Sequence, residues 1–272
     1  MSSASRLSYA DASDKLTAAT AKATAAQLAT VADEILSVAG LLRAQPRLRR
    51  ALTDPSRRGP ERGDLLKSLL SGKVTAAALE VLVTLASGRW STPNELLDAT
   101  ERLGVEALLR SAGKADKLGE VEDELFRFGQ IVSGNPGLAV TLSDPSAAPS
   151  RRVKLVEDLL KGKSQPVTLR LAETALEGFG GRSFESSLTR LVELTAAQRD
   201  RQVAYVTVAK PLDESEEERL TTKLSDIYGR QVSLKVDVDP SVIGGISVKV
   251  GSDFYDGTIL RRLNEARQAF AK

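Results

Sequence analysis

The sequence contains neither histidine nor cysteine, and aromatic residues make up only 4% of its 272 residues. Without these side chains the chain cannot form a Ser-His-Asp or Cys-His nucleophilic site, a zinc site with His or Cys ligands, or a disulfide bond. Carboxylates remain available for catalysis, but no pair of them stands apart from the many charges expected on helix surfaces. We therefore expect no enzyme and no cofactor, and keep a carboxylate enzyme as a minor alternative.

A strong excess of charge is also missing. The 38 basic residues nearly cancel the 36 acidic ones, which leaves a net charge of +2. Nucleic-acid-binding proteins usually carry a clearer basic excess and aromatic rings that stack on bases. No nucleic-acid partner is expected.

Long hydrophobic runs are the third absence. No segment approaches the roughly 18 consecutive apolar residues of a membrane span, and the N-terminal residues lack the apolar core of a signal peptide. We expect a chain that lies in the cytoplasm or on a membrane surface, without direct membrane insertion.

Apolar residues at helical spacing fill most of the first 200 residues. The clearest seam is formed by Leu28, Val31, Ile35, Val38 and Leu42. The same pattern returns 90 residues later. Without any gap, segments 28–73 and 118–163 share 16 identical positions out of 46, against about three expected from average composition. This internal duplication predicts two tandem helical bundles rather than a short-repeat solenoid.

The pattern changes beyond residue 200. Alternating apolar residues mark strands at 203–209, 232–238 and 246–250. Asp213 and Glu216 predict a capped helix between the first two strands, and a last helix is expected from about residue 259 onward. These elements form a small α+β unit.

The expected fold is therefore mainly α with a small α+β C-terminal domain. It has two tandem helical-bundle modules followed by a strand-helix-strand-strand-helix domain. The expected domain limits are 1–100 for an extra helical module, 101–202 for a second helical domain, and 203–272 for the α+β domain.

Gly244 and Gly245 invite comparison with a phosphate-binding loop. A dinucleotide fingerprint needs G-x-G-x-x-G between a strand and a helix, whereas this pair precedes a strand. A close approach of two backbone segments explains the pair better than a ligand contact.

The C-terminal run nevertheless carries a resemblance. V-D-P, I-G-G, V-K-V-G and D-G occur in this order between residues 238 and 257, and R-L follows at 262–263. This run resembles the C-terminal signature of the delta subunit of F-type ATP synthases, whose mitochondrial counterpart is the oligomycin-sensitivity-conferring protein. Its signature residues, expected to be structural, are Asp239, Pro240, Gly244, Gly245, Gly251, Asp256 and Gly257.

The resemblance implies a non-catalytic subunit at the top of the peripheral stalk. In that family the helical domain binds N-terminal segments of the alpha subunits, and the C-terminal domain binds the ends of b-type stalk subunits. The protein would hold the catalytic head still while the rotor turns. It would lie peripherally on the cytoplasmic side of the cell membrane. An unrelated helical scaffold or adaptor is the alternative function.

The resemblance also implies a groove between the first and fifth helices of the alpha-binding domain, here roughly 101–112 and 166–179. The candidate groove residues are Leu103, Leu108, Leu169, Ala172 and Leu176. Ordinary core positions would show the same apolar spacing, so both interpretations stay open.

Residues 1–100 depart from the usual family plan, which has a single helical domain. We expect this extra copy to reinforce the stalk by contacting b-type helices or a second alpha N-terminus. Its arginine-rich segment from Arg47 to Arg62 would then be a solvated face or meet an acidic partner.

Overall fold

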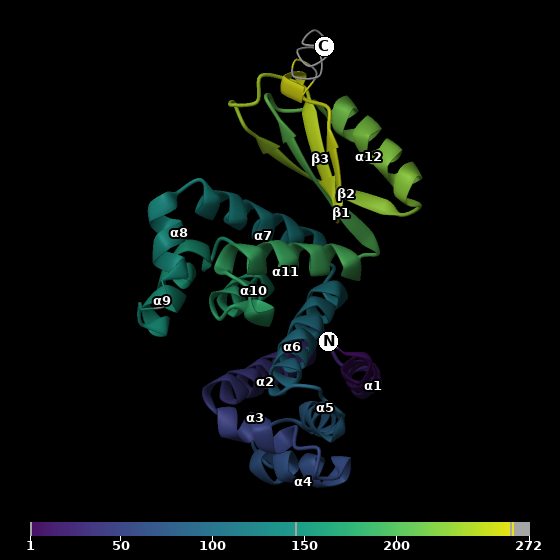
Figure 1. Ribbon diagram of the computed structural model, residues 1–272, viewed down its shortest axis with the longest axis vertical. Coiled ribbons are helices and arrows are strands. Elements are labelled where there is room, and N and C mark those ends of the chain that lie inside the picture. Colours follow the sequence, from purple (N-terminus) through teal and green to yellow (C-terminus); the bar gives the residue numbers. More distant parts are fainter. Residues whose placement is uncertain (1, 145, 262, 264–272) are drawn as a thin grey trace, which may run out of the picture.

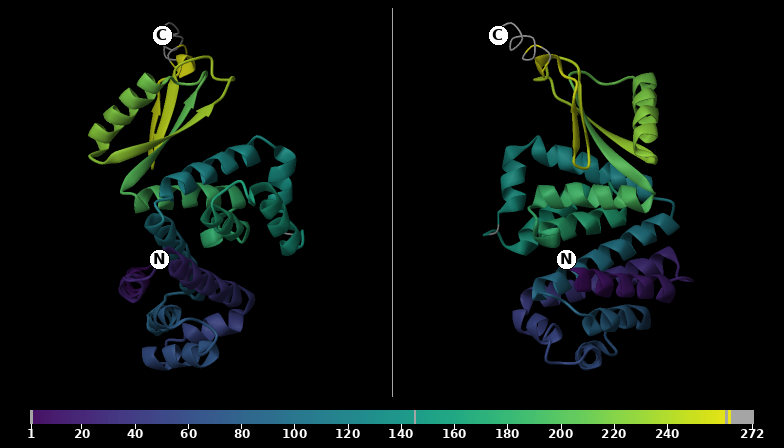
Figure 2. Two further views of the ribbon diagram at one scale, coloured as in Figure 1. Left: turned by 180° about the vertical axis from the view of Figure 1, so that it is seen from behind. Right: turned by 45° about the vertical axis from the view of Figure 1, so that its right-hand side comes forward.

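The computed structural model describes residues 2–144, 146–261 and 263 of the chain. The first helical module comprises α1 (Ser3–Ala19), α2 (Ala25–Ala44), α3 (Pro46–Leu52), α4 (Gly59–Leu70), α5 (Ala76–Ser87) and α6 (Pro93–Lys114). The second module begins with α6 itself and continues with α7 (Leu118–Ser133), α8 (Pro136–Ser143), α9 (Pro149–Leu160), α10 (Pro166–Leu176), the short 3-10 helix η1 (Phe179–Gly181) and α11 (Phe184–Gln198). The two modules and the α+β domain follow one another along the long axis of the molecule (Figures 1 and 2).

The duplication expected from the sequence is confirmed as a repeat of helices. Four helices of the first module, α1, α3, α4 and α5, begin 90 residues before α6, α8, α9 and α10, respectively. Within residues 2–144 and 146–200 only helices and connecting turns are found, as predicted. Helix α6 is thus the last helix of the first module and the first helix of the second. The expected domain limit between residues 100 and 101 lies inside it.

A glutamate that is identical in the two modules accepts a backbone and a hydroxyl hydrogen bond at the start of the equivalent helix. Glu34 of α2 accepts hydrogen bonds from the backbone nitrogen of Thr75, at 3.0 Å, and from its hydroxyl, at 2.6 Å. Ninety residues on, Glu124 accepts from the backbone nitrogen of Gln165, at 2.9 Å, and from the Thr168 hydroxyl, at 2.5 Å. Each carboxylate satisfies backbone donors at the start of a helix, where no intrahelical acceptor exists.

An arginine repeated in both modules caps the C-terminal ends of α5 and α10, the helices whose N-terminal ends the two glutamates bind. Arg62 is buried and donates to the carbonyl oxygens of Ala86, at 3.3 Å, and of Gly88, at 2.7 Å, at the end of α5. Arg152 donates to Leu176 at the end of α10, at 3.4 Å. Arginine suits this role because its planar guanidinium offers several donors at once. Arg62, expected on a charged outer face, is therefore a capping residue of the interior.

Helix α6 is buried around most of its circumference because both modules pack on it. Leu97, Leu103, Val105 and Leu108 are all buried, and so are polar residues such as Glu101. A helix buried on most of its sides lies inside a larger body, although the stripe of Asp98, Arg102, Glu106 and Arg110 stays at least partly exposed. Gly104 permits the close approach of α2, because a Cβ atom there would lie 2.6 Å from the Leu36 side chain.

Ion pairs across the shared helix join the modules. Arg43 of α2 reaches the buried carboxylate of Glu101 at 2.6 Å, and it also contacts Glu177 after α10. Glu101 accepts a further hydrogen bond from the backbone nitrogen of Gly180 at 2.9 Å. Burial raises the pKa of Glu101, although the Gly180 hydrogen bond and Arg43 act in the opposite direction. One carboxylate thus connects α2, α6 and η1.

The C-terminal domain holds a four-stranded sheet. Its elements are β1 (Arg201–Val208), α12 (Glu214–Tyr228), β2 (Gln231–Val238), β3 (Ile246–Val250) and β4 (Asp253–Asp256). The strand order is β2-β1-β3-β4, with β1 and β2 parallel and the other neighbours antiparallel. Helix α12 begins at the predicted Asp213–Glu216 capping box and covers one face, where Val206, Val232 and Leu224 form a second core.

The limit expected at 202/203 lies inside β1. The last helix, expected from about residue 259, falls mostly outside the described residues. Helix α2 is long and apolar enough to cross a membrane by length and composition, but its inner face forms the core of the first module, and Asp33 and Glu34 make internal polar contacts.

Two glycines of the helical pair test the close packing of α2 and α6. Gly104→Ala is expected to lower the free energy of unfolding by about 1–3 kcal/mol, because the new methyl group overpacks against Leu36. Gly40→Ala on α2 is the matched control. A Cβ atom there meets nothing within 4 Å, so it should stabilise the protein by about 0.5–1 kcal/mol through helix propensity. Urea unfolding followed by Trp90 fluorescence measures both, and equal effects would contradict the tight contact.

Candidate functional site: the junction and binding surfaces

A buried charge network fastens the sheet to the second helical module. Glu122 of α7 is fully buried and accepts a hydrogen bond from the Ser233 hydroxyl of β2 at 2.6 Å. It also pairs with Lys235 of β2 at 2.8 Å and with Arg199, just after α11, at 2.9 Å. Lys235 is only 4% exposed and makes a second ion pair with Asp123 at 2.6 Å. Every charge in this network has an opposite partner, as burial requires.

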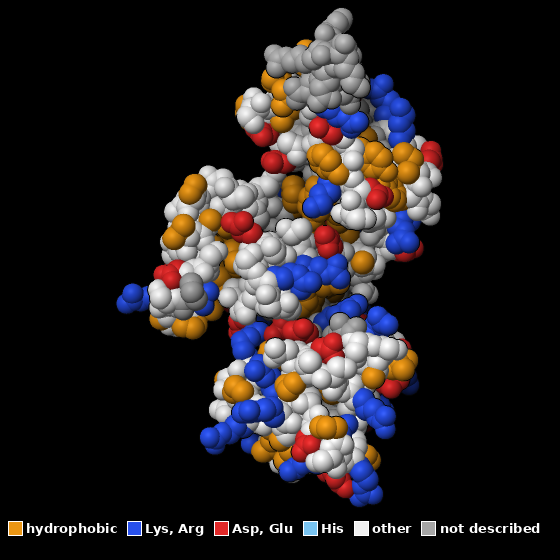
Figure 3. All heavy atoms as spheres, in the orientation of Figure 1, with side chains coloured by type: hydrophobic (Ala, Val, Ile, Leu, Met, Phe, Trp, Pro, Cys, Tyr) orange, Lys and Arg blue, Asp and Glu red, His pale blue; other side chains and the backbone are white. Residues whose placement is uncertain are grey.

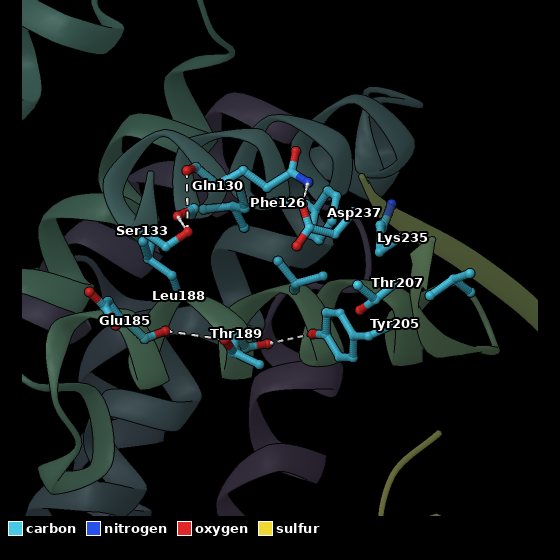
Figure 4. Close-up of a pocket in the computed structure, with 14 residues that line it drawn as sticks. Phe126, Gln130, Ser133, Glu185, Leu188, Thr189, Tyr205, Thr207, Lys235 and Asp237 are labelled. Atoms are coloured by element: carbon cyan, nitrogen blue, oxygen red, sulfur yellow. Dashed lines mark hydrogen bonds between the residues drawn. The ribbon is translucent and has the colours of Figure 1, made fainter. Parts of the chain in front are cut away.

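A cavity of 280 Å³ lies beside this network, between α7, α11 and the first two strands. Figure 4 shows the Gln130 amide turned toward Asp237, to which it donates at 3.1 Å. It also shows the Tyr205 hydroxyl turned toward the backbone oxygen of Thr189, at 3.5 Å. Burial is the main cause that raises the pKa of Tyr205, with Glu193 and Glu122 adding to it. These polar atoms bond one another, so the arrangement serves a packed junction better than catalysis.

The part of the chain that the structure describes also offers no group of three or more His, Asp, Glu or Cys residues that could hold a metal ion. This finding concerns residues 2–144, 146–261 and 263 alone. The ion pairs and hydrogen bond of Glu122 connect α7 with β2 and with the end of α11, so they hold the sheet against the second helical module.

The five candidate groove residues lie where α6 and α10 meet the rest of the helical core. Leu103, Leu108, Ala172 and Leu176 are buried, with at most 7% of their surface exposed. Leu169 is half-buried at the edge of the same core. Helix α2 lies close by, because Arg170 of α10 pairs with Asp33 of α2 at 2.7 Å. Of the five side chains, Leu169 is thus the one that offers appreciable surface to a partner.

The signature residues of the C-terminal run form a crossing of two backbone segments. Gly245 has a φ of +83°, and a Cβ atom there would lie 2.9 Å from the Cα atom of Thr258 and still closer to the carbonyl oxygen of Gly257. Gly257 donates its backbone N–H to the carbonyl oxygen of Ile246 at 2.9 Å. Glycine is required at such a crossing because any side chain would separate the segments.

Two aspartates of the signature hold the flanking turns. Asp239, which precedes Pro240, accepts from the backbone nitrogen of Ser241 at 2.8 Å, and hydrogen bonds from Ser241 lower its pKa. Asp256 accepts from the backbone nitrogen of Thr258 at 2.9 Å, and hydrogen bonds from Thr258 lower its pKa in the same way. Gly251 has a φ of +60° in the turn between β3 and β4. The geometry thus gives these positions roles in backbone shape.

Apolar side chains remain exposed on the C-terminal domain. Phe254 of β4 is 64% exposed and Ile243, in the loop before β3, is 67% exposed. Ile259, Leu260 and Leu263 follow with between 42% and 51% of their surface exposed. Large exposed apolar side chains are a common feature of protein-binding surfaces when they lie together.

Comparison with known proteins identifies the family of the chain. The family model described as ATP synthase delta (OSCP) subunit matches residues 105–270, more than half of the chain. The ATP synthase subunit delta of Salinispora arenicola is 62% identical and covers 98% of both chains. Those of a Parafrankia species and Streptomyces coelicolor are 44% and 40% identical over the whole of this chain, and over 100% and 98% of their own.

These relatives define a non-catalytic subunit of the ATP synthase peripheral stalk. The chain belongs to the ATP synthase delta (OSCP) subunit family. The family model begins at residue 105, inside α6, so helices α1 to α5 precede the matched region. The Parafrankia relative nevertheless aligns with the whole of this chain, including the first module. The alternative of an unrelated scaffold is therefore wrong.

Loss of one charge should show what the junction network contributes. Glu122→Gln leaves Lys235 buried with a weakened set of partners, so we expect the free energy of unfolding to fall by about 3 kcal/mol. Glu120→Gln, on the same helix, removes an exposed pair with Lys117 and should change stability little. Urea unfolding followed by circular dichroism makes the comparison. Equal loss in both variants would show that the network does not fasten the domains.

Proposed function

We propose that this chain links the catalytic head of the proton-translocating ATP synthase to its b-type stalk, so that rotation is coupled to ATP synthesis. The helical part binds N-terminal segments of alpha subunits, and residues 203–272 bind b-type subunits. The chain sits peripherally on the cytoplasmic side of the cell membrane and itself carries out no catalysis. The observation that carries this proposal is the Glu122–Lys235–Arg199 network, because a link between two bodies must hold its own domains in fixed orientation.

A chain that binds one partner at each end acts as a link between the two partners. Two partners held by one stiff chain raise each other's effective concentration, and neither contact has to be strong alone. The exposed apolar side chains of the C-terminal domain suit the apolar face of a stalk helix. The α6–α10 seam, with Leu169 at its edge, is the proposed site for an alpha segment.

The first module offers its own seam between α1 and α5. A cavity of 400 Å³ lies there. Its apolar lining residues, Ala19, Ala23, Val31 and Ala77, are mostly small, and its polar ones are Thr20, Lys22, Gln27, Thr30 and Thr75. The equivalent seam of the second module lies along α6 and α10. We propose that the first module holds a second alpha segment or a b-type helix in this seam. Smaller side chains bury less apolar area, so its contact is weaker.

Two surface substitutions test the two ends of the link and control for each other. Leu169→Asp should weaken binding of a peptide from the alpha N-terminus about tenfold or more, without affecting a peptide from the C-terminal end of a b-type stalk protein. Phe254→Asp should do the reverse. Fluorescence anisotropy with each labelled peptide measures all four affinities. Leu169 is chosen over Leu108, which is fully buried and would report folding instead. The assignment fails if either variant binds both peptides as well as the unchanged chain does.

The arginine-rich edge of the first module provides a further test. Arg47 and Arg50 of α3 are exposed and have no side-chain partner within the described residues, in contrast to Arg62. Arg47→Glu with Arg50→Glu should lower the salt concentration at which the purified synthase releases its head, because exposed attractions are screened by salt. Arg151→Glu on α9 is the exposed control. Unchanged salt resistance of the double variant would remove the acidic partner from the proposal.

A further inference from the structure

A groove that neither module could form alone runs over the shared helix. Two adjoining cavities, of 290 and 380 Å³, have Arg102 and Leu194 in common and therefore form one groove between α1, α6 and α11. Its floor is a single stripe of α6 at helical spacing, from Asp98 through Arg102 and Val105 to Leu109. At a rise of about 1.5 Å per residue this stripe is roughly 16 Å long, or three helical turns.

The walls of the groove repeat the helical spacing of its floor. They are formed by Arg6, Tyr9 and Ser13 of α1 and by Arg190, Leu194 and Gln198 of α11. Ridges spaced three and four residues apart are the surface into which another helix packs. The shape therefore suits a helical segment laid along α6.

One end of the groove is strongly basic. Arg6, Arg102, Arg182 and Arg190 line it together, against the single carboxylate of Asp98. Among these arginines, Arg190 pairs with Glu193 at 2.8 Å and Arg102 lies 4.5 Å over the Tyr9 ring. Arg6 and Arg182 have no ion pair within the described residues. Figure 3 shows basic side chains gathered over α11 and at its boundary with the first module.

The other end of the groove is neutral and partly apolar. Its acidic residue, Glu106, accepts hydrogen bonds from the Tyr9 hydroxyl at 2.8 Å and the Ser13 hydroxyl at 2.9 Å. It is also paired with Arg110 at 2.6 Å, so its charge is compensated within the chain. Leu194 and Ala197 of α11 offer apolar surface above the buried Val105 and Leu109.

We propose that this groove binds an amphipathic helix of a partner protein that carries carboxylates at one end and apolar residues along the following turns. The carboxylates meet the four arginines, and the apolar residues lie against Leu194 and Ala197. A single small oxyanion would fill only the basic end, whereas the groove continues for three turns. The proposal does not depend on the alpha and b assignments above, because it concerns a surface built from both modules.

The absence of cysteine makes a direct test simple. Gln198→Cys at the rim, labelled with an environment-sensitive dye, reports binding of a synthetic peptide of about 15 residues with glutamates in its first turns and leucines at helical spacing. A saturable signal that weakens with salt is expected, and a peptide with lysines in place of the glutamates should not bind. Ser68→Cys on α4, labelled in the same way, should give no signal.

The arginines are then tested with a matched pair of double variants. Arg182→Ala with Arg190→Ala should weaken binding of the acidic peptide about tenfold or more. Arg50→Ala with Arg151→Ala removes the same charge elsewhere and should leave the affinity unchanged. Trp90 fluorescence during thermal unfolding confirms that both variants are folded. Equal affinity of the two double variants, or binding of the lysine peptide, would overturn the proposal. Displacement of the peptide by millimolar inorganic phosphate alone would instead reveal a simple oxyanion pocket and also overturn it.

Discussion

The structure depends on one helix, α6, on which both helical modules pack, so that their buried side chains form one continuous core. Because α6 closes the first bundle and opens the second, the residues that face α2 and those that face α10 and α11 are buried on different sides of it. This explains why Gly104 and Glu101 share a helix with so many leucines. Glycine admits α2 closely, and the carboxylate collects donors from both sides. The outer helix α1 packs within the first module alone. Its Leu7, at the position equivalent to the buried Leu97, is 66% exposed.

The repeat was predictable because identical residues recur at one constant offset of 90 positions. That the two modules share helix α6 was not predictable. The seam of Leu28 to Leu42 and the offset of 90 predict the helices of both modules. They do not show where one module stops, because a helix common to both has no turn residues to mark a limit. Glu34 and Glu124, or Arg62 and Arg152, were visible as identical positions. Their roles at helix ends depend on partners 24 to 44 residues away, which spacing alone does not identify.

The candidate binding surfaces could likewise be predicted only in part from the sequence. The family resemblance implied Leu103, Leu108, Leu169, Ala172 and Leu176 as groove residues, but only tertiary packing shows that Leu169 is at the edge while the others are inside. Gly244 and Gly245 could be assigned to backbone geometry because their sequence context excluded a phosphate loop. The junction between Glu122 and Lys235 had no sequence signal, since these residues lie 113 positions apart and each looks like an ordinary surface charge.

Sharing a helix also changes how the molecule bears load. Two bundles joined by a linker can bend at the linker, whereas two bundles that share a helix bend only if that helix breaks or the core packed around it deforms. Helix α6 is 22 residues long, or about 33 Å, and the fully buried Glu122 anchors the sheet to the next helix. A force entering at the first module would therefore pass to the C-terminal domain through packed side chains and ion pairs. The duplication has thus lengthened the molecule without adding a flexible linker between the two helical modules.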